Sequence, residues 1–297
     1  MRLFFKLLLI FASSCVASPA WSASCCGGGT SFPSLISGDF EWQFSSSLSS
    51  SQVLADSNIS GTTIARTDDF RLSSNTLSLM GSYLLSDLWQ VGIVLPVTEN
   101  SYKASTHKHY SLGDTEVFLG YEALPETTFS LWKPRAIVYL RMILPTGLSI
   151  YDSVNPLEQP ATGRGFFTPS MGVFIFKTWS HWDLQALAAI ETPLEQRFNE
   201  ILYRPQWNYR GLIGAGYSFA KGLRIGASVA PSYVGGVEVP SHHATSSSYF
   251  DTSIVTSFMP NPSWLFSASY TDQTLLPSWN QPLSQTFSLF IQRRTML

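Results

Sequence analysis

Charged residues and long apolar runs are both scarce in this chain. Asp, Glu, Lys and Arg make up 13% of its 297 residues, about half the usual share for a soluble globular protein. Yet beyond the first residues no apolar stretch reaches the roughly 18 residues that a membrane-spanning helix requires. The formal net charge of -2 is small, so it indicates neither nucleic acid nor an acidic partner. The apolar residues must therefore be distributed in another way.

Cysteine is nearly absent as well, with only Cys15, Cys25 and Cys26 in the whole chain. Neighbouring cysteines rarely form an intramolecular disulfide, because the bond would strain the peptide between them. Two cysteines without further ligands also do not build a zinc site. We interpret Cys25 and Cys26 as inert or bridged thiols on a flexible N-terminus. A metal or redox pair, or a lipid on Cys15 or Cys25, is the alternative.

The first residues have the pattern of a secretory leader. Arg2 and Lys6 precede a short apolar core, and small residues follow it, which is the order of a signal peptide and its cleavage site. We expect residues 1–23 to form the signal peptide. Residues 24–35 are then an N-terminal periplasmic segment, and residues 36–297 form the remaining domain.

That domain alternates apolar and polar residues in segments whose connections are alternately short and long. Such a pattern is typical of a transmembrane β-barrel, whose strands turn one face to lipid and the other to a lumen. In these barrels the short turns and both termini lie on the periplasmic side. We predict an all-β, antiparallel up-and-down barrel of about twelve strands in the cell outer membrane, as a monomer with lipid around it. The strands are expected near residues 36–48, 70–85, 88–100, 110–124, 131–145, 165–178, 182–195, 203–219, 222–236, 247–259, 263–274 and 284–296.

Tryptophan placement favours the same architecture. Indole rings prefer the membrane interface, where the ring is half apolar and its N–H reaches water. Tryptophans at the ends of a soluble β-sandwich are the alternative interpretation. The five that flank the expected short turns are Trp89, Trp132, Trp179, Trp182 and Trp264.

The two faces of each strand can be assigned from charge. Ile93 and Leu95 share one face of their strand, whereas Gln90 lies on the other. In the last strand, Leu289 is similarly opposed to Ser288. Because a charge at the middle of the membrane costs about 2–4 kcal/mol, the apolar faces should meet lipid and the charged faces the lumen. The residues expected to line the lumen are Asp114, Glu116, Glu122, Lys133, Arg135, Tyr139, Arg141, Asp183, Gln185, Glu191, Arg204, Asn208 and Arg210.

Cross-strand pairing would neutralise much of this charge. A turn centred near Thr127 sets Asp114 opposite Arg141 and Glu122 opposite Lys133, and one register of the later strands brings Glu191 to Arg210. The lumen of a twelve-stranded barrel is wider than that of a filled eight-stranded barrel and narrower than a porin channel. The charges therefore indicate either a conduit or binding site for a small solute, or a salt network that plugs the barrel. In the second case the barrel would be a structural protein whose external loops bind partners.

No catalytic or metal-binding constellation is evident. The paired histidines, His107 with His109 and His242 with His243, fall in expected external loops without a cysteine or carboxylate at ligand spacing, so we interpret them as solvated. Serines are abundant, but none shares a strand face with a histidine in the manner of a hydrolase. The sequence therefore predicts no enzyme, no cofactor and no metal.

Two short motifs resemble a known family. Ser111 to Tyr121 forms a strand centred on Gly113-Asp114, and Leu144-Pro145-Thr146-Gly147 follows the next strand. Together with the segment from Gly163 to Ile190, they resemble a family of outer-membrane barrels named for the meta-cleavage pathway of phenol degradation. The resemblance covers about 80 residues, and it implies a transporter of small, often hydrophobic compounds, including aromatic ones. The chain ends in Thr295-Met296-Leu297 rather than on the aromatic residue usual in such barrels.

Overall fold

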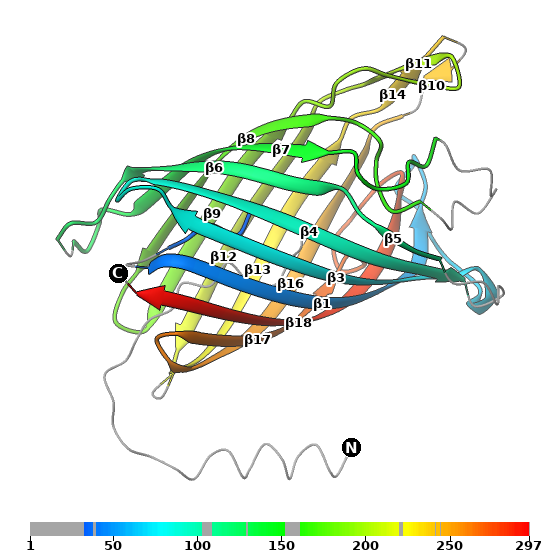
Figure 1. Cartoon of the computed structure of the whole chain (residues 1–297). Coiled ribbons are helices and arrows are strands. Elements are labelled where there is room, and N and C mark those ends of the chain that lie inside the picture. The colour runs from blue at the N-terminus through cyan, green and yellow to red at the C-terminus, as the bar shows by residue number, and fades with distance from the viewer. Residues whose placement is uncertain are drawn as a thin grey trace, which may run out of the picture.

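Twelve long strands form one closed antiparallel barrel (Figure 1). The computed structural model describes residues 33–37, 40–102, 109–128, 130–151, 161–219, 222–240, 242–243 and 245–296. Each barrel strand pairs with the next in the chain, and the last pairs with the first, so the predicted architecture is confirmed. The barrel strands are β1(Phe40–Ser57), β3(Leu72–Leu84), β4(Trp89–Tyr102), β6(Thr115–Leu124), β7(Arg135–Leu144), β8(Thr168–Thr178), β9(Trp182–Glu191), β12(Asn208–Ser218), β13(Leu223–Val234), β16(Ser247–Asn261), β17(Trp264–Asp272) and β18(Gln281–Met296).

The barrel closes where its first strand, β1, pairs with its last strand, β18, along nearly their full length. The pairing of β1 with β18 runs from Phe40 opposite Met296 to Ser57 opposite Gln281. With 18 residues, β1 is longer than the roughly 9–11 residues that a spanning strand needs. The far ends of these strands therefore extend beyond the bilayer on the side of the long loops.

The connections segregate by length as predicted. The links β3–β4, β6–β7, β8–β9, β12–β13 and β16–β17 lie at the end where the chain terminus C is marked in Figure 1. The longer links at the other end contain β2(Thr63–Ala65), η1(Asp68–Phe70), β5(His109–Leu112), β10(Gln196–Phe198), β11(Ile201–Pro205), β14(Val237–Val239) and β15(His242–His243). β10, β11, β14 and β15 form a separate sheet beyond the barrel. Within the described residues, no helix is long and apolar enough to cross a membrane.

The outward face of the barrel is apolar. Ile93 and Leu289 are 40% and 47% exposed, whereas Gln90 and Ser288 on the opposite faces of the same strands are buried. Trp89 and Trp182 begin their strands directly after short turns and are exposed on the outer surface. A closed barrel leaves no unpaired backbone edge, and an apolar outer face suits it to lipid. The protein is thus an outer-membrane β-barrel.

The inward face carries an apolar cluster as well as the predicted polar residues. β7 shows why the alternation missed it: from Ala136 to Leu140 the strand is apolar on both faces, so the sequence gives no contrast between inside and outside. The cluster consists of Leu35, Phe118, Ile137, Tyr139, Phe174, Phe176, Leu187, Leu212 and Ala230.

Candidate functional site in the barrel interior

An ion network occupies the inner wall toward the long-loop end, with Arg141 and Glu191 buried and Arg164 exposed. Glu191, at the end of β9, is completely buried. One of its carboxylate oxygens lies 2.6 Å from Arg141 Nη2 and 3.0 Å from Arg210 Nε. The other oxygen lies 3.4 Å from Arg164 Nη1 and accepts a hydrogen bond of 3.3 Å from Asn208 Nδ2. Such charge-assisted contacts stabilise a carboxylate that burial alone would destabilise.

Arg141 extends the network to a second strand. Its Nη1 lies 3.2 Å from Glu116 Oε2 on β6. The ion pairs of the network join three arginines, Arg141, Arg164 and Arg210, to two glutamates, and the carboxylates of Asp114 and Asp251 lie close enough to interact with Arg164 and Arg210 respectively. The guanidinium groups of this network are hydrogen-bond donors, so a polar or anionic group in this part of the lumen would find partners there.

Two further ion pairs lie toward the short-turn end. Arg135 at the start of β7 bonds both carboxylate oxygens of Glu122, at 2.7 and 3.0 Å, and lies over the ring of Phe176. Arg224 at the start of β13 bonds both oxygens of Asp183, at 2.6 and 2.5 Å. Bidentate ion pairs of this kind fix the orientation of both side chains.

The apolar cluster lies between these two charged levels. On β7, Ile137 and Tyr139 come between Arg135 and Arg141 along the inward face. On β9, Leu187 comes between Asp183 and Glu191. The half of the inner wall that contains β7 and β9 therefore has a charged level near each end and an apolar level between them along the barrel axis. The other half carries small hydroxyl side chains, among them Ser45, Ser47, Ser49, Ser267, Ser269 and Ser288.

Inward glycines make room for the large side chains of this wall. Gly172 is paired directly with Tyr139, and a Cβ at Gly172 would lie 2.5 Å from the Tyr139 ring. Gly92 is likewise paired with Phe118, and a Cβ there would lie 2.3 Å from its ring. Each aromatic ring thus lies flat across its neighbouring strand instead of crossing the lumen.

The two motifs that carry the family resemblance meet at the long-loop rim. Asp114 accepts hydrogen bonds from the backbone N–H groups of Gly147 at 3.1 Å and Arg164 at 2.7 Å. The Thr146 hydroxyl donates to the carbonyl of Gly113 at 2.7 Å. Burial raises the pKa of Asp114 above its usual range, although the two N–H groups oppose this effect. The motifs therefore clamp the β7–β8 loop and set Arg164 beside Glu191.

Residues 33–37 lie against the inner wall near the short-turn end. The backbone N–H of Ile36 donates to Gln90 Oε1 at 2.6 Å, and Gln43 Nε2 donates to the carbonyl of Ser34 at 2.7 Å. Leu35 packs into the apolar cluster. The remainder of the predicted periplasmic segment 24–35 lies outside the described residues, as do the predicted signal peptide, all three cysteines and His107.

Ten of the thirteen residues predicted to line the lumen lie on the inward face, and three do not. Arg204 belongs to β11 in the separate outer sheet, where it is exposed and lies 3.2 Å from Glu195. Lys133 is exposed in the turn before β7, and Asp114 lies in the loop before β6. The ten inward residues are Glu116, Glu122, Arg135, Tyr139, Arg141, Asp183, Gln185, Glu191, Asn208 and Arg210.

The predicted register between β6 and β7 is wrong. Arg141 stands opposite Phe118 rather than Asp114, and Glu122 stands opposite Ile137 rather than Lys133. Alternation fixes which face a side chain occupies, but a shift by an even number of residues leaves the faces unchanged. The predicted contact between Glu191 and Arg210 does form, although Asn208 is the residue directly opposite Glu191.

Arg164 and Arg224 are functional candidates that the sequence did not single out. Arg164 lies in a long loop, where no alternation of apolar and polar residues indicates which way its side chain points. The inward direction of Arg224 could have been predicted, because Arg224 is the only charged residue of β13 and alternates with outward apolar residues. Among the described residues, no three His, Cys, Asp or Glu side chains gather closely enough to hold a metal ion.

Known structures share this architecture. No family model matches the chain. An outer membrane channel from Pseudomonas putida F1 is similar over 90% of this chain and 99% of its own, with a TM-score of 0.72 and 12% identity. The NanC porin matches with a TM-score of 0.46 and 8% identity, over 84% of this chain and 98% of its own. At 12% identity the similarity to the Pseudomonas putida channel concerns the fold, a closed outer-membrane barrel.

Proposed function

We propose that this barrel is an outer-membrane channel for a small solute that combines an apolar body with a polar or anionic group. The observation that supports this proposal most directly is the inward apolar cluster, which lies between two charged levels of the inner wall. Aromatic side chains gain nothing from facing a purely aqueous lumen, because apolar surface is stabilised by contact with other apolar surface. Phe174 and Tyr139 are only 2% and 1% exposed, so a ring or short alkyl group would reach them once Leu35, which packs into the same cluster, moves aside. Arg141 and Arg210 would meet the polar group.

The similar protein from Pseudomonas putida F1 is an outer membrane channel by description, which supports a channel role for this fold. The resemblance of the Gly113-Asp114 and Leu144 to Gly147 motifs points in the same direction, toward small hydrophobic or aromatic compounds. We propose no catalytic step, and a monomer is sufficient because the chain closes its own barrel. The ten inward polar residues described above would line the path.

Flux into liposomes tests this proposal. Benzenesulfonate and methanesulfonate carry the same anionic group and differ in the aromatic ring, and neither crosses a bare bilayer readily. Purified barrel should pass benzenesulfonate faster than methanesulfonate, with protein-free liposomes as the blank. If neither ion enters faster than in the blank, the channel proposal fails.

A structural barrel with a plugged lumen is the second candidate. It is favoured by the tight packing of the inner wall, where Glu191 and Ser45 are both 0% exposed, and by residues 33–37. In that case the outer sheet of β10, β11, β14 and β15 would bind partners. If the barrel is structural, deleting residues 195–205 should abolish partner capture without altering solute flux. If it is a channel, the deletion variant should keep its flux, and the wild type should capture no partner.

A further inference from the structure

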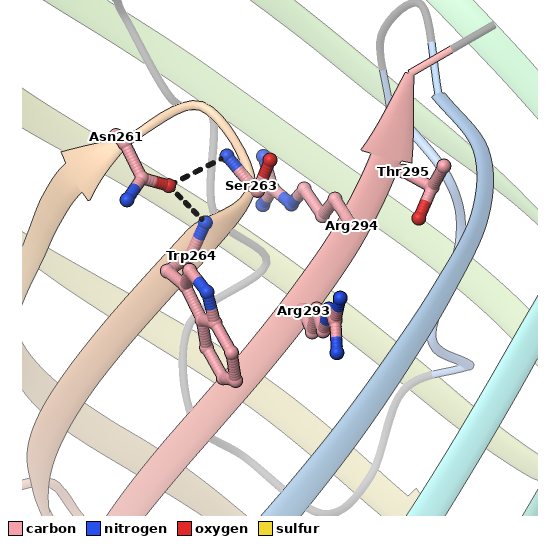
Figure 2. Close-up of a pocket in the computed structure, with 6 residues that line it drawn as sticks. All are labelled: Asn261, Ser263, Trp264, Arg293, Arg294 and Thr295. Atoms are coloured by element: carbon pink, nitrogen blue, oxygen red, sulfur yellow. Dashed lines mark hydrogen bonds between the residues drawn. The ribbon is translucent and has the colours of Figure 1, made fainter.

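An open pocket of about 520 Å³ lies at the short-turn rim, between the β16–β17 turn and the end of β18 (Figure 2). Its lining contains two arginines, one tryptophan and no acidic residue. The turn is held in shape by Asn261, whose Oδ1 accepts the backbone N–H groups of Ser263 at 3.0 Å and Trp264 at 3.1 Å. The six lining residues are Asn261, Ser263, Trp264, Arg293, Arg294 and Thr295.

The two arginines face opposite sides of the barrel wall. Arg294 points inward: its Nε donates to Gln292 at 2.9 Å, and its guanidinium lies 5.0 Å from the ring centre of Phe40. Its backbone N–H also bonds the carbonyl of Ser263 at 2.8 Å, which fastens the turn to β18. Arg293 is exposed on the outward face, so it is the arginine that the surrounding membrane meets.

Arg293 lies among aromatic side chains, at the level of the tryptophans that flank the short turns. It is paired with Trp264 on β17 and with Phe44 on β1, and its guanidinium lies 5.6 Å from the Trp264 ring centre. Among the described residues, no carboxylate forms an ion pair with it. A guanidinium at the membrane interface without an acidic neighbour favours an anion from outside the protein.

The surface next to Arg293 continues as an apolar strip along the same two strands. Phe266 and Ile291 are directly paired one step further into the membrane, and both are exposed on the outer face. A ligand held by Arg293 would therefore have its charged part at the rim and apolar chains beside these residues. Free phosphate would use only the first of these two contacts.

We infer that Arg293 and Trp264 form a binding site for the phosphate group of a phospholipid in the periplasm-facing leaflet. Arginine binds phosphate through parallel N–H donors, and tryptophan is favoured at headgroup level. The turn fixed by Asn261 and Arg294 holds both side chains in place before a lipid arrives.

Native mass spectrometry of the detergent-solubilised barrel, equilibrated with phosphatidylglycerol, tests the site. The wild type should retain one lipid per barrel, and Arg293→Gln should lower that occupancy about tenfold, the effect of losing one charge-assisted contact. Arg293→Lys keeps the charge and should lose only a few-fold. Arg204→Gln, at an exposed arginine of the outer sheet, is the matched control and should change nothing.

Equal occupancy in the wild type and Arg293→Gln would overturn the inference. Full displacement of the lipid by millimolar sodium phosphate would also overturn it, because the site would then recognise free phosphate. Heat-modifiable gel migration shows whether each variant is folded. If Arg293→Gln does not fold, Trp264→Leu takes its place, with a several-fold loss of lipid expected and unchanged occupancy contradicting the site.

Discussion

Arg224 of β13 reaches across the whole width of β12 to bond Asp183 of β9 with two contacts of 2.5 and 2.6 Å. Gly216 lies beneath the guanidinium, and a Cβ there would lie 2.2 Å from Arg224 Nη2. Both charged side chains are buried. The pair therefore ties three strands of the inner wall together and depends on a position without a side chain.

Gly216→Ala should weaken this tie. The added methyl group would push the guanidinium off Asp183 and leave two buried charges poorly paired, at a cost of roughly 3 kcal/mol. The change is measured as a lower temperature of heat-modifiable unfolding. Gly81→Ala is the matched control, because the nearest atom to its Cβ is 4.0 Å away. Equal unfolding temperatures for the two variants would contradict the role of Gly216.

Neutralising Arg141 should change the ion selectivity of an open barrel. Arg141→Gln removes one of the three arginines around Glu191, so the lumen becomes less positive and the reversal potential in a planar bilayer should shift toward cations. Arg204→Gln removes an equal charge outside the barrel and should leave the potential unchanged. Identical potentials for both variants would show that Arg141 does not face the conducting path.

The β6–β7 turn should loosen in acid. Burial alone would raise the pKa of Glu126, but the hydrogen bonds from Lys177 and the backbone of Ser130 hold that pKa below its ordinary value of 4.5. A lowered folded pKa means that the stabilisation is complete above the unfolded value and is lost as the pH falls through the folded one.

Glu126→Gln should therefore cost about 1 kcal/mol of folding free energy at neutral pH, and the difference from the wild type should shrink toward zero as the pH falls through the lowered pKa of Glu126. Thermal unfolding at several pH values measures it. Glu195→Gln, which alters an exposed pair, should have little effect at any pH. A Glu126→Gln deficit that stays constant across the pH range would contradict the assigned pKa.

Releasing residues 33–37 should ease passage through the barrel. Gln90→Leu removes both the acceptor of the Ile36 N–H and the donor to the Ile36 carbonyl. The segment loses two hydrogen bonds to the wall, and solute flux should rise at least several-fold if each lost bond is worth about 1 kcal/mol. Gln52→Leu, at an exposed position of β1, is the control. Unchanged flux in Gln90→Leu would mean that the segment does not limit passage.

The sequence predicts the barrel well and its interior only in part. Alternation in strands such as β4 separates Gln90 from Ile93 because lipid and lumen demand opposite side chains. Alternation does not fix the offset between neighbouring strands, so the sequence predicts Lys133 as the partner of Glu122, whereas the structure pairs Glu122 with Arg135. The expected strand 203–219 places Arg204 in the barrel, whereas the structure ends β11 at Pro205 and begins β12 at Asn208.

The central claim is that solute contacts the inward apolar cluster as it crosses the barrel. The most direct measurement is the ratio of benzenesulfonate to methanesulfonate flux in Phe174→Ser, compared with Phe287→Ser on the outward face. We predict that the inward change lowers the ratio toward one and that the outward change leaves it at the wild-type value. A ratio that is unaffected by Phe174→Ser would contradict the account.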